Sequence, residues 1–457
     1  MDFKRDIYKR LLEWKNDYTG KVLEVSGARQ VGKTYILKKF ANENFEQAIY
    51  INMAELTGAR FIMCLDEAEY WEPGTPMREK PVHEALRLFY QEFKDTRDSI
   101  IIIDEIQESS RIYNLIRTFA REFSCYVIVT GSYLGRLLAK EFFLPAGDLE
   151  SVTLETLTFA EFAEVFGQRE IYDSIDLFGR ADAKQYETLK ECYDLYQRIG
   201  GYPSVIKVYL EYKSYERCDE ELARLMGIFT NESKRYFDDV METETFEKLF
   251  HGIAVTLIRE KQGVRDLVED LSKIVYKGES GRFTKKMINH AIGWLRASHI
   301  IAYASKSIDC DYLNIKENSR FYFLDVGIAQ YFVKKAGAGE ITVKSIVAEN
   351  FVYLTLLRRL PREIAGNAPW FASFEKTKGE LDFYVRSLMD NKNYGIEVKS
   401  TDAQARTARA LFDARKLDFV YYLKGGSNGG IAEGGQIMTV PIYLADRITF
   451  DLGKSIE

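Results

Sequence analysis

The strongest constraint on the fold is a glycine-rich segment, Gly27–Thr34, with the sequence GARQVGKT. It has the Gly-x4-Gly-Lys-Thr spacing of a P-loop and directly follows the apolar run Val22–Val25. In such a loop backbone N–H groups point at phosphate oxygens, the lysine reaches the β- and γ-phosphates, and the threonine hydroxyl holds Mg²⁺. We therefore predict an ATP site between a buried strand and a helix. Its expected contact residues are Gly27, Ala28, Arg29, Gln30, Val31, Gly32, Lys33, Thr34 and Tyr35.

A second segment, Ser99–Glu105, supplies the acidic residues that such a site requires. Its four consecutive isoleucines predict a central parallel strand, because strands covered on both faces are apolar throughout. The strand ends in Asp104, which we expect to bind Mg²⁺, and Glu105, which we expect to polarise the attacking water. Alone, this pattern would also fit a buried strand that ends in a solvated acidic turn. Together with the P-loop it predicts ATP hydrolysis, with Lys33 and Glu105 as the catalytic residues.

Two further apolar runs, residues 48–53 and 126–130, predict neighbouring strands of the same sheet. Thr130, or Ser132 just after it, is a candidate sensor of the γ-phosphate; an ordinary turn hydroxyl is the alternative. Apolar residues at helical spacing between 111 and 123 predict a helix between two strands. Residues 1–169 are therefore predicted to form a P-loop ATPase core with a mostly parallel sheet.

Composition sets the broad class of protein. A chain of 457 residues is too long for one core, so several domains are expected. The net charge of −6 gives no overall basic field to attract nucleic acid. Five scattered cysteines without C-x-x-C spacing favour neither a disulfide framework nor a zinc site. No signal peptide and no run of about 18 apolar residues is present, which predicts a cytoplasmic protein without a membrane span.

The middle of the chain divides into two predicted regions. Residues 170–272 have a helical pattern and are predicted to form a lid beside the ATPase core. Residues 273–338 combine a helix with strands at 300–303 and 320–325, the outline of a winged helix. Such domains bind DNA or serve as protein-interaction modules. Basic residues gather where DNA phosphates would be met: Lys273, Lys277, Arg282, Lys285 and Lys286.

The last region, residues 339–457, carries a second chemical pattern. Two predicted strands, 381–385 and 394–399, would bring Asp382 close to Glu397 if they pair. Two carboxylates could hold a divalent metal beside a scissile phosphate, with Lys399 placed to orient or deprotonate a water. Glu349, on an upstream helix, could be an additional ligand. The alternative is a surface hairpin with a Glu–Lys pair, which would contribute less than about 1 kcal/mol to stability.

The order of these pieces resembles a widespread prokaryotic family of AAA-superfamily ATPases. The resemblance rests on GARQVGKT, IIIIDEIQ, TGSYLG, LTFAEF, GGYP, FYFLDVG, GELDF and IEVKS. It implies an α/β multidomain fold with a P-loop ATPase core, a helical lid, a winged helix and a C-terminal restriction-endonuclease-like domain of the PD-(D/E)XK type. It further implies ATP and Mg²⁺ at the first site, and a nuclease-like site at Asp382, Glu397 and Lys399. Asp148 stands where many relatives carry a basic residue, so no arginine finger is assigned.

Three functions are compatible with these patterns. The first is a DNA-associated ATPase whose nucleotide state controls a nuclease-like C-terminal domain, with a second Mg²⁺ or Mn²⁺ held by Asp382 and Glu397. The second is a nucleotide-driven switch whose C-terminal domain binds DNA or a protein without cleaving it. The third is a regulator that recognises a protein and then assembles. The partners considered are ATP, double-stranded DNA and further copies of the chain.

Overall fold

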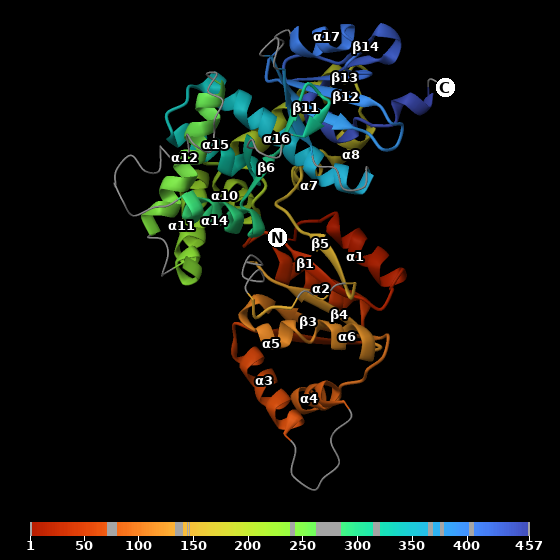
Figure 1. Cartoon of the computed structure of the whole chain (residues 1–457), viewed down its shortest axis with the longest axis vertical. Helices are drawn as coiled ribbons and strands as arrows, with labels where there is room; N and C mark the ends of the chain where they lie inside the picture. Colours follow the sequence, from red (N-terminus) through yellow and green to blue (C-terminus); the bar gives the residue numbers. More distant parts are fainter. Residues whose placement is uncertain are drawn as a thin grey trace. The chain divides into compact units, whose positions relative to one another are not determined.

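The computed structural model describes residues 2–70, 80–132, 140–143, 145, 147–237, 243–261, 285–313, 320–363, 369–374, 379–401 and 406–455 (Figure 1). Two compact units are present. The P-loop unit contains Lys4–Glu155 and Gly293–His299. The C-terminal unit contains Met1–Phe3, Thr156–Ile292 and Ile300–Glu457.

The P-loop unit is built on a five-stranded sheet in the order β2-β3-β4-β1-β5, with every neighbouring pair parallel. The four isoleucines of β3 are all buried, as expected for a central strand. Parallel strands bring their carboxyl ends to one edge, so the P-loop after β1 and the acidic residues at the end of β3 meet there. The strands are β1 Val22–Ser26, β2 Gln47–Asn52, β3 Ser99–Asp104, β4 Tyr126–Thr130 and β5 Leu149–Thr153.

Helices connect these strands, and their apolar residues complete the core. The helix expected between 111 and 123 is two shorter helices, α5 and α6. The apolar core gathers residues from β2, β3 and β4 with residues from α3, α4, α5 and α6. The helices are α1 Ile7–Asn16, α2 Lys33–Asn44, α3 Leu56–Glu69, α4 Pro81–Phe89, the 3-10 helix η1 Ile106–Glu108, α5 Ser110–Tyr113 and α6 Ile116–Glu122.

The C-terminal unit contains a mixed eight-stranded sheet in the order β14-β15-β13-β12-β11-β10-β7-β8. A separate antiparallel pair, β6 with β9, comes from the strands expected at 300–303 and 320–325. The two short strands between them, β7 and β8, join the large sheet. The strands are β6 Ile301–Ala304, β7 Lys306–Ile308, β8 Tyr312–Leu313, β9 Arg320–Phe323, β10 Trp370–Ser373, β11 Glu380–Arg386, β12 Asn393–Lys399, β13 Phe419–Lys424, β14 Gly430–Ala432 and β15 Ile437–Pro441.

The rest of the described part of this unit is mainly helical. Thr158 and Glu161 form the capping box that starts α7, with both reciprocal hydrogen bonds present. The helices are α7 Phe159–Val165, α8 Arg169–Ser174, α9 Ala183–Ile199, α10 Pro203–Tyr212, α11 Tyr215–Phe237, α12 Thr243–Lys261, α14 Lys285–Ala297, α15 Val326–Lys335, α16 Glu340–Glu363 and α17 Arg406–Asp413, with the 3-10 helices η3 Glu433–Gly435, η4 Ile442–Arg447 and η5 Leu452–Ser455. The last residues of α14, from Gly293, belong to the P-loop unit.

An aromatic cluster joins the helical region to the C-terminal sheet region. Phe159 of α7 and Tyr193 of α9 both contact Phe351 of α16, with ring centroids 6.4 and 4.9 Å away. Tyr193 also lies 6.2 Å from Tyr443 of η4. The rings are tilted or edge-to-face, the arrangement that aromatic pairs prefer. The helical region and the C-terminal sheet region therefore share one core.

Asp325 links two segments that are far apart in the sequence. Its buried carboxylate caps α15 by accepting hydrogen bonds from the N–H groups of Gly327 (2.8 Å) and Ile328 (3.1 Å), and it accepts a third from Gly201 (2.9 Å). A side chain at Gly200, which has a φ of +75°, would place a Cβ 2.3 Å from Asp325 Oδ1. The GGYP and FLDVG motifs therefore fit against each other through glycine.

Several sequence predictions fall outside the described residues or side chains. Lys273, Lys277 and Arg282 lie in residues 262–284, which the structure does not describe. Lys285 and Lys286 begin α14, but their side chains are not described. The basic patch of the predicted winged helix therefore stays a prediction. Among the described helices, none has the length and hydrophobicity that crossing a membrane would require.

We expect Asp325→Ala to lower the free energy of unfolding by about 3 kcal/mol or more, because three buried N–H groups lose a charged acceptor. The control is Asp182→Ala. Asp182 caps the exposed start of α9, where such a loss costs about 1 kcal/mol. Denaturant unfolding of both variants measures the difference. Equal losses in the two variants would show that the Asp325 carboxylate stabilises the fold no more than an ordinary helix cap does.

Candidate functional site

The backbone of the P-loop depends on glycine at its first position. Gly27 has a φ of +143°, and a Cβ there would lie 2.0 Å from the carbonyl oxygen of Leu154. Gly32 has a φ of +98° and is the last residue before α2. The same loop holds Gln30, a non-glycine residue, at a φ of +65°. A loop with these positive φ angles, followed by a helix N-terminus, is the form that binds phosphate groups.

Lys33 is held inside this loop. Its Nζ donates to the carbonyl oxygens of Gly27 (2.9 Å) and Ala28 (2.8 Å) and to Ser132 Oγ (3.0 Å). Burial lowers the pKa of Lys33 to about 8, although the nearby Glu105 and Asp104 act in the opposite direction. A bound phosphate would stabilise the charged form of this lysine. Its position is therefore suited to contact the phosphates of a nucleotide.

Two hydroxyl groups meet the carboxylate of Asp104 at the end of β3. Thr34 Oγ1 donates to Asp104 Oδ2 at 2.6 Å, and the hydroxyl of Tyr50 donates to the same oxygen at 2.8 Å. A hydroxyl and a carboxylate at this spacing are hard oxygen ligands of the kind that Mg²⁺ prefers. The predicted metal residues Thr34 and Asp104 therefore fit the cation. Tyr50 supports the carboxylate from the neighbouring strand β2.

Glu105 adopts an unusual backbone conformation just after β3. Its φ of 51° and ψ of 44° are left-handed, which costs a non-glycine residue roughly 1 kcal/mol or more. Its carboxylate accepts a hydrogen bond from Gln107 Nε2 at 2.5 Å. Its charge also acts on Lys33. The residue predicted to polarise the attacking water thus lies near the P-loop lysine.

The remaining predicted nucleotide residues have different surroundings. The Thr130 hydroxyl donates a hydrogen bond to the carbonyl oxygen of Val25 at 2.7 Å. Of the two candidate phosphate sensors, Ser132 is the one whose hydroxyl accepts a hydrogen bond from Lys33. Val31 is fully buried, whereas Tyr35 is 55% exposed. The charge of Arg29 acts on Lys33. His299 is a further neighbour: burial lowers its pKa to about 4, and the charge of Lys33 acts in the same direction.

The C-terminal acidic residues also come together. Strands β11 and β12 pair antiparallel in the large sheet. Lys399 Nζ lies 2.9 Å from Glu397 Oε1 and 3.8 Å from Asp382 Oδ2. Asp382 Oδ2 also accepts from the backbone N–H of Val398 at 2.8 Å. Glu397 is only 5% exposed, which does not fit a solvated surface hairpin.

One oxygen of this cluster lacks a partner. Glu397 Oε2 is buried and has no hydrogen-bond partner among the residues that the structure describes. Burial first, and the charge of Asp382 second, raise the pKa of Glu397 to about 7, against the opposing effect of Lys399. A buried carboxylate oxygen of this kind could accept a cation. Asp382 and Glu397 therefore fit a divalent metal, although no group of three or more potential metal-ligating side chains exists among the described residues.

Glu349 of α16 is tied to the strands before it. Its Oε1 accepts from Arg320 Nη1 at 3.1 Å and from the hydroxyl of Tyr322 at 2.9 Å. Arg320 also donates to Glu380 Oε2 at 3.1 Å. Glu349 acts electrostatically on Glu397, so it lies beside the cluster. Arg320 and Tyr322 thus fix the orientation of the predicted additional ligand.

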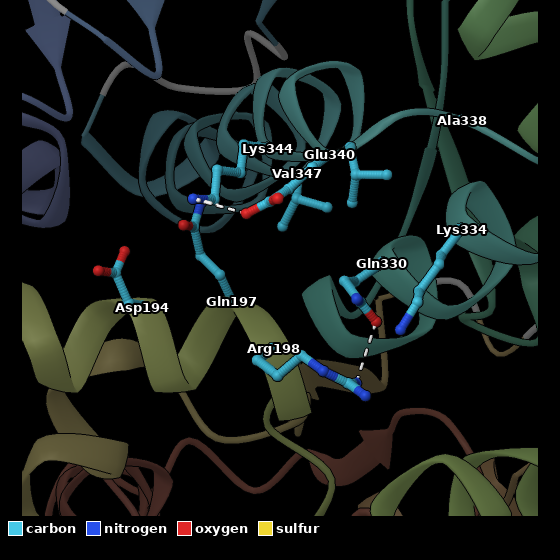
Figure 2. Close-up of a pocket in the computed structure, with 10 residues that line it drawn as sticks. Asp194, Gln197, Arg198, Gln330, Lys334, Ala338, Glu340, Lys344 and Val347 are labelled. Atoms are coloured by element: carbon cyan, nitrogen blue, oxygen red, sulfur yellow. Dashed lines mark hydrogen bonds and ion pairs between the residues drawn. The ribbon is translucent and has the colours of Figure 1, made fainter. Parts of the chain in front are cut away.

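A separate hollow of about 480 Å³ lies among α9, α15 and α16 (Figure 2). Most of its charged groups are paired. Arg198 donates to both carboxylate oxygens of Asp219 at 2.7 Å and to Gln330 at 3.2 Å. Lys344 lies 3.2 Å from Glu340. The hollow therefore has no clear excess of one charge that would define a ligand.

Comparison with known proteins identifies the first domain. Residues 19–163 match a family model described as an AAA domain. Together with the loop and strand geometry, this match assigns these residues to an AAA-type P-loop ATPase domain. The chain is thus an ATP-binding and ATP-hydrolysing protein. No curated protein matches it.

Several solved structures are similar to this chain over much of its length. A Walker-type ATPase of Pyrococcus abyssi is 17% identical, with a TM-score of 0.47, over 72% of this chain and 96% of that one. The ORC2 protein of Aeropyrum pernix is 11% identical, with a TM-score of 0.33, over 76% and 94%. The ORC1 protein of Aeropyrum pernix, solved in complex with DNA, is 13% identical, with a TM-score of 0.26, over 77% and 93%.

Sequence reasoning missed four residues that contact the candidate sites. They are Tyr50, Gln107, Arg320 and Tyr322. Tyr50 lies on β2, and the sequence alone does not show that β2 is the neighbour of β3 in the sheet. Gln107 could have been considered, since it stands two residues after Glu105 in the acidic motif. Arg320 and Tyr322 are brought to Glu349 only by tertiary packing.

Titration of Glu397 should be visible in stability. Its pKa in the folded state is raised above the ordinary carboxyl value, so its stabilising contribution is present at acid pH and is lost as pH rises through about 7. Relative to Glu397→Gln, the unmodified protein should lose unfolding free energy between pH 5 and pH 7, by roughly 1 kcal/mol per pH unit, and lose little more at higher pH. Denaturant unfolding of both proteins tests this. Parallel pH curves would contradict the buried, proton-binding state of Glu397.

Proposed function

We propose that this protein is an ATPase whose nucleotide state controls a metal-dependent, nuclease-like site on double-stranded DNA. One observation carries the second half of the proposal. Asp382, Glu397 and Lys399 come together on the C-terminal sheet, and the buried Glu397 has a carboxylate oxygen without a hydrogen-bond partner among the described residues. A structural ion pair would not need a second, nearly buried carboxylate, because burying such charges is costly.

In the proposed ATPase site, Lys33 would bind the β- and γ-phosphates, and Thr34 and Asp104 would hold Mg²⁺. When bound, the Mg²⁺ would neutralise charge on the phosphate oxygens. Glu105 accepts a hydrogen bond from the attacking water and orients it toward the γ-phosphate. Ser132 holds Lys33 from the loop after β4 and is the better candidate sensor of the phosphate.

In the proposed C-terminal site, Asp382 and Glu397 would hold Mg²⁺ or Mn²⁺, which would stabilise charge on a scissile phosphate. Lys399 lies within reach of both carboxylates and is placed to orient or deprotonate a water. The buried Glu349 is a candidate third ligand. In this proposal the C-terminal unit contains a winged helix and a restriction-endonuclease-like domain. The chain also assembles with further copies of itself.

A second function is favoured by a different observation. Lys399 already neutralises Glu397 at 2.9 Å, and Glu349 is already bound by Arg320 and Tyr322. These pairs would hold the cluster together without a metal. The C-terminal domain would then bind DNA or a protein without cleaving it, as the output of a nucleotide-driven switch.

We expect Lys33→Ala to reduce ATP turnover on the order of 100-fold or more, since it removes a positive charge directed at the transferring phosphate. Lys39→Ala is the matched control, because Lys39 lies on the same helix, α2, and forms an ion pair with Glu43 one turn further along it, at 4.0 Å. Phosphate release measures both. Normal turnover in Lys33→Ala would overturn the assignment of the P-loop.

The C-terminal site is tested by an assay for cleavage of plasmid and linear duplex DNA. The assay contains Mg²⁺ or Mn²⁺ and is run with and without ATP. The proposal predicts cutting that Lys399→Ala abolishes and that Lys416→Ala retains. The Lys416 side chain forms an exposed ion pair with Asp311, so its loss should have little effect. If neither the unmodified protein nor the control cuts, the non-cleaving switch is the better account.

A further inference from the structure

The acidic motif contains one buried polar residue to which the ATPase assignment gives no role. Gln107 lies in η1, two residues after Glu105, and its side chain is only 1% exposed. Its amide nitrogen donates to Glu105 Oε2 at 2.5 Å. Its amide oxygen is buried and has no hydrogen-bond partner among the described residues.

The orientation of this amide is fixed by chemistry. An ionised carboxylate can only accept hydrogen bonds, so the NH₂ group of Gln107 must face Glu105 and the oxygen must point away. A buried acceptor without a partner costs about 1–3 kcal/mol. A residue retained only for stability would not be expected here, because an apolar side chain of similar size would avoid that cost.

The backbone conformation at Glu105 brings the Gln107 amide next to the Glu105 carboxylate. Glu105 has left-handed dihedral angles, and this turn is what brings a side chain two residues later back onto its carboxylate. The fully buried Ile106 anchors the turn in the core of the P-loop unit. Gln107 and Glu105 are therefore held in one relative geometry by a rigid segment.

We propose that Gln107 is a positioning residue for ATP hydrolysis, which holds the carboxylate of Glu105 in the orientation that accepts from the attacking water. The bond to Gln107 occupies Oε2, which leaves Oε1 to face the water. This inference rests on the proposed role of Glu105 as the water-polarising residue. Loss of the contact frees the carboxylate to rotate, and misplacement of a catalytic group by about 1 Å can reduce a rate on the order of 100-fold.

The test is Gln107→Met in the full chain, since methionine keeps the length of the side chain and removes the amide. We expect kcat for ATP to fall about 10- to 100-fold, KM to change less than about threefold, and the melting temperature to stay the same or rise. Gln47→Met is the matched control. Gln47 bonds the backbone of Glu92 and Lys94 at the start of β2, so its loss should lower the melting temperature and leave kcat unchanged.

Glu105→Gln separates the two claims. If Glu105→Gln retains normal turnover, the role proposed for Glu105 is wrong. If Glu105→Gln loses turnover but Gln107→Met does not, only the inference about Gln107 is overturned. If both act through one carboxylate, adding Gln107→Met to Glu105→Gln should lower kcat no further, whereas multiplied losses would show independent roles and contradict the inference.

Discussion

The hydrogen bond between Thr34 and Asp104 is the contact on which the nucleotide site depends. It joins the first turn of α2 to the end of β3, although the strand before α2, β1, is separated from β3 by β4. Only the order of the parallel strands brings these two residues to one edge. The same strand order also brings Lys33, Ser132 and Glu105 to this edge, because each lies in a segment that follows the carboxyl end of a strand.

The C-terminal cluster depends on a different balance, between burial and charge. Asp382, Glu397 and Glu349 are close enough to repel one another, and Lys399 and Arg320 offset part of that repulsion. Such an arrangement costs stability unless it is fully paired. The partnerless oxygen of Glu397 shows that the pairing within the described residues is incomplete. Under the function proposed above, this oxygen would accept a cation.

Much of the P-loop unit was predictable from the sequence, because its signals are local. The loop spacing, the buried isoleucines and the two carboxylates after them together predict a P-loop nucleotide site. Such a site lies at the carboxyl edge of a parallel sheet. The hydrogen-bond partner of Thr130 was not predictable, since it depends on the register of β4 against β1. In the C-terminal unit, the pairing of β11 with β12 was predictable. The inclusion of β7 and β8 in the same sheet, and the contacts of Glu349 with Arg320 and Tyr322, arise from long-range packing that no local pattern encodes.

The central claim is that the chain carries two separate divalent-metal sites, one of which requires nucleotide. Counting bound Mn²⁺ by electron paramagnetic resonance, with and without a non-hydrolysable ATP analogue, tests this most directly. The account predicts one bound ion per chain without nucleotide and a second with it, and it predicts that Asp382→Asn removes only the first. Mn²⁺ binding that always requires nucleotide, and that Asp382→Asn does not change, would contradict the metal site in the C-terminal unit.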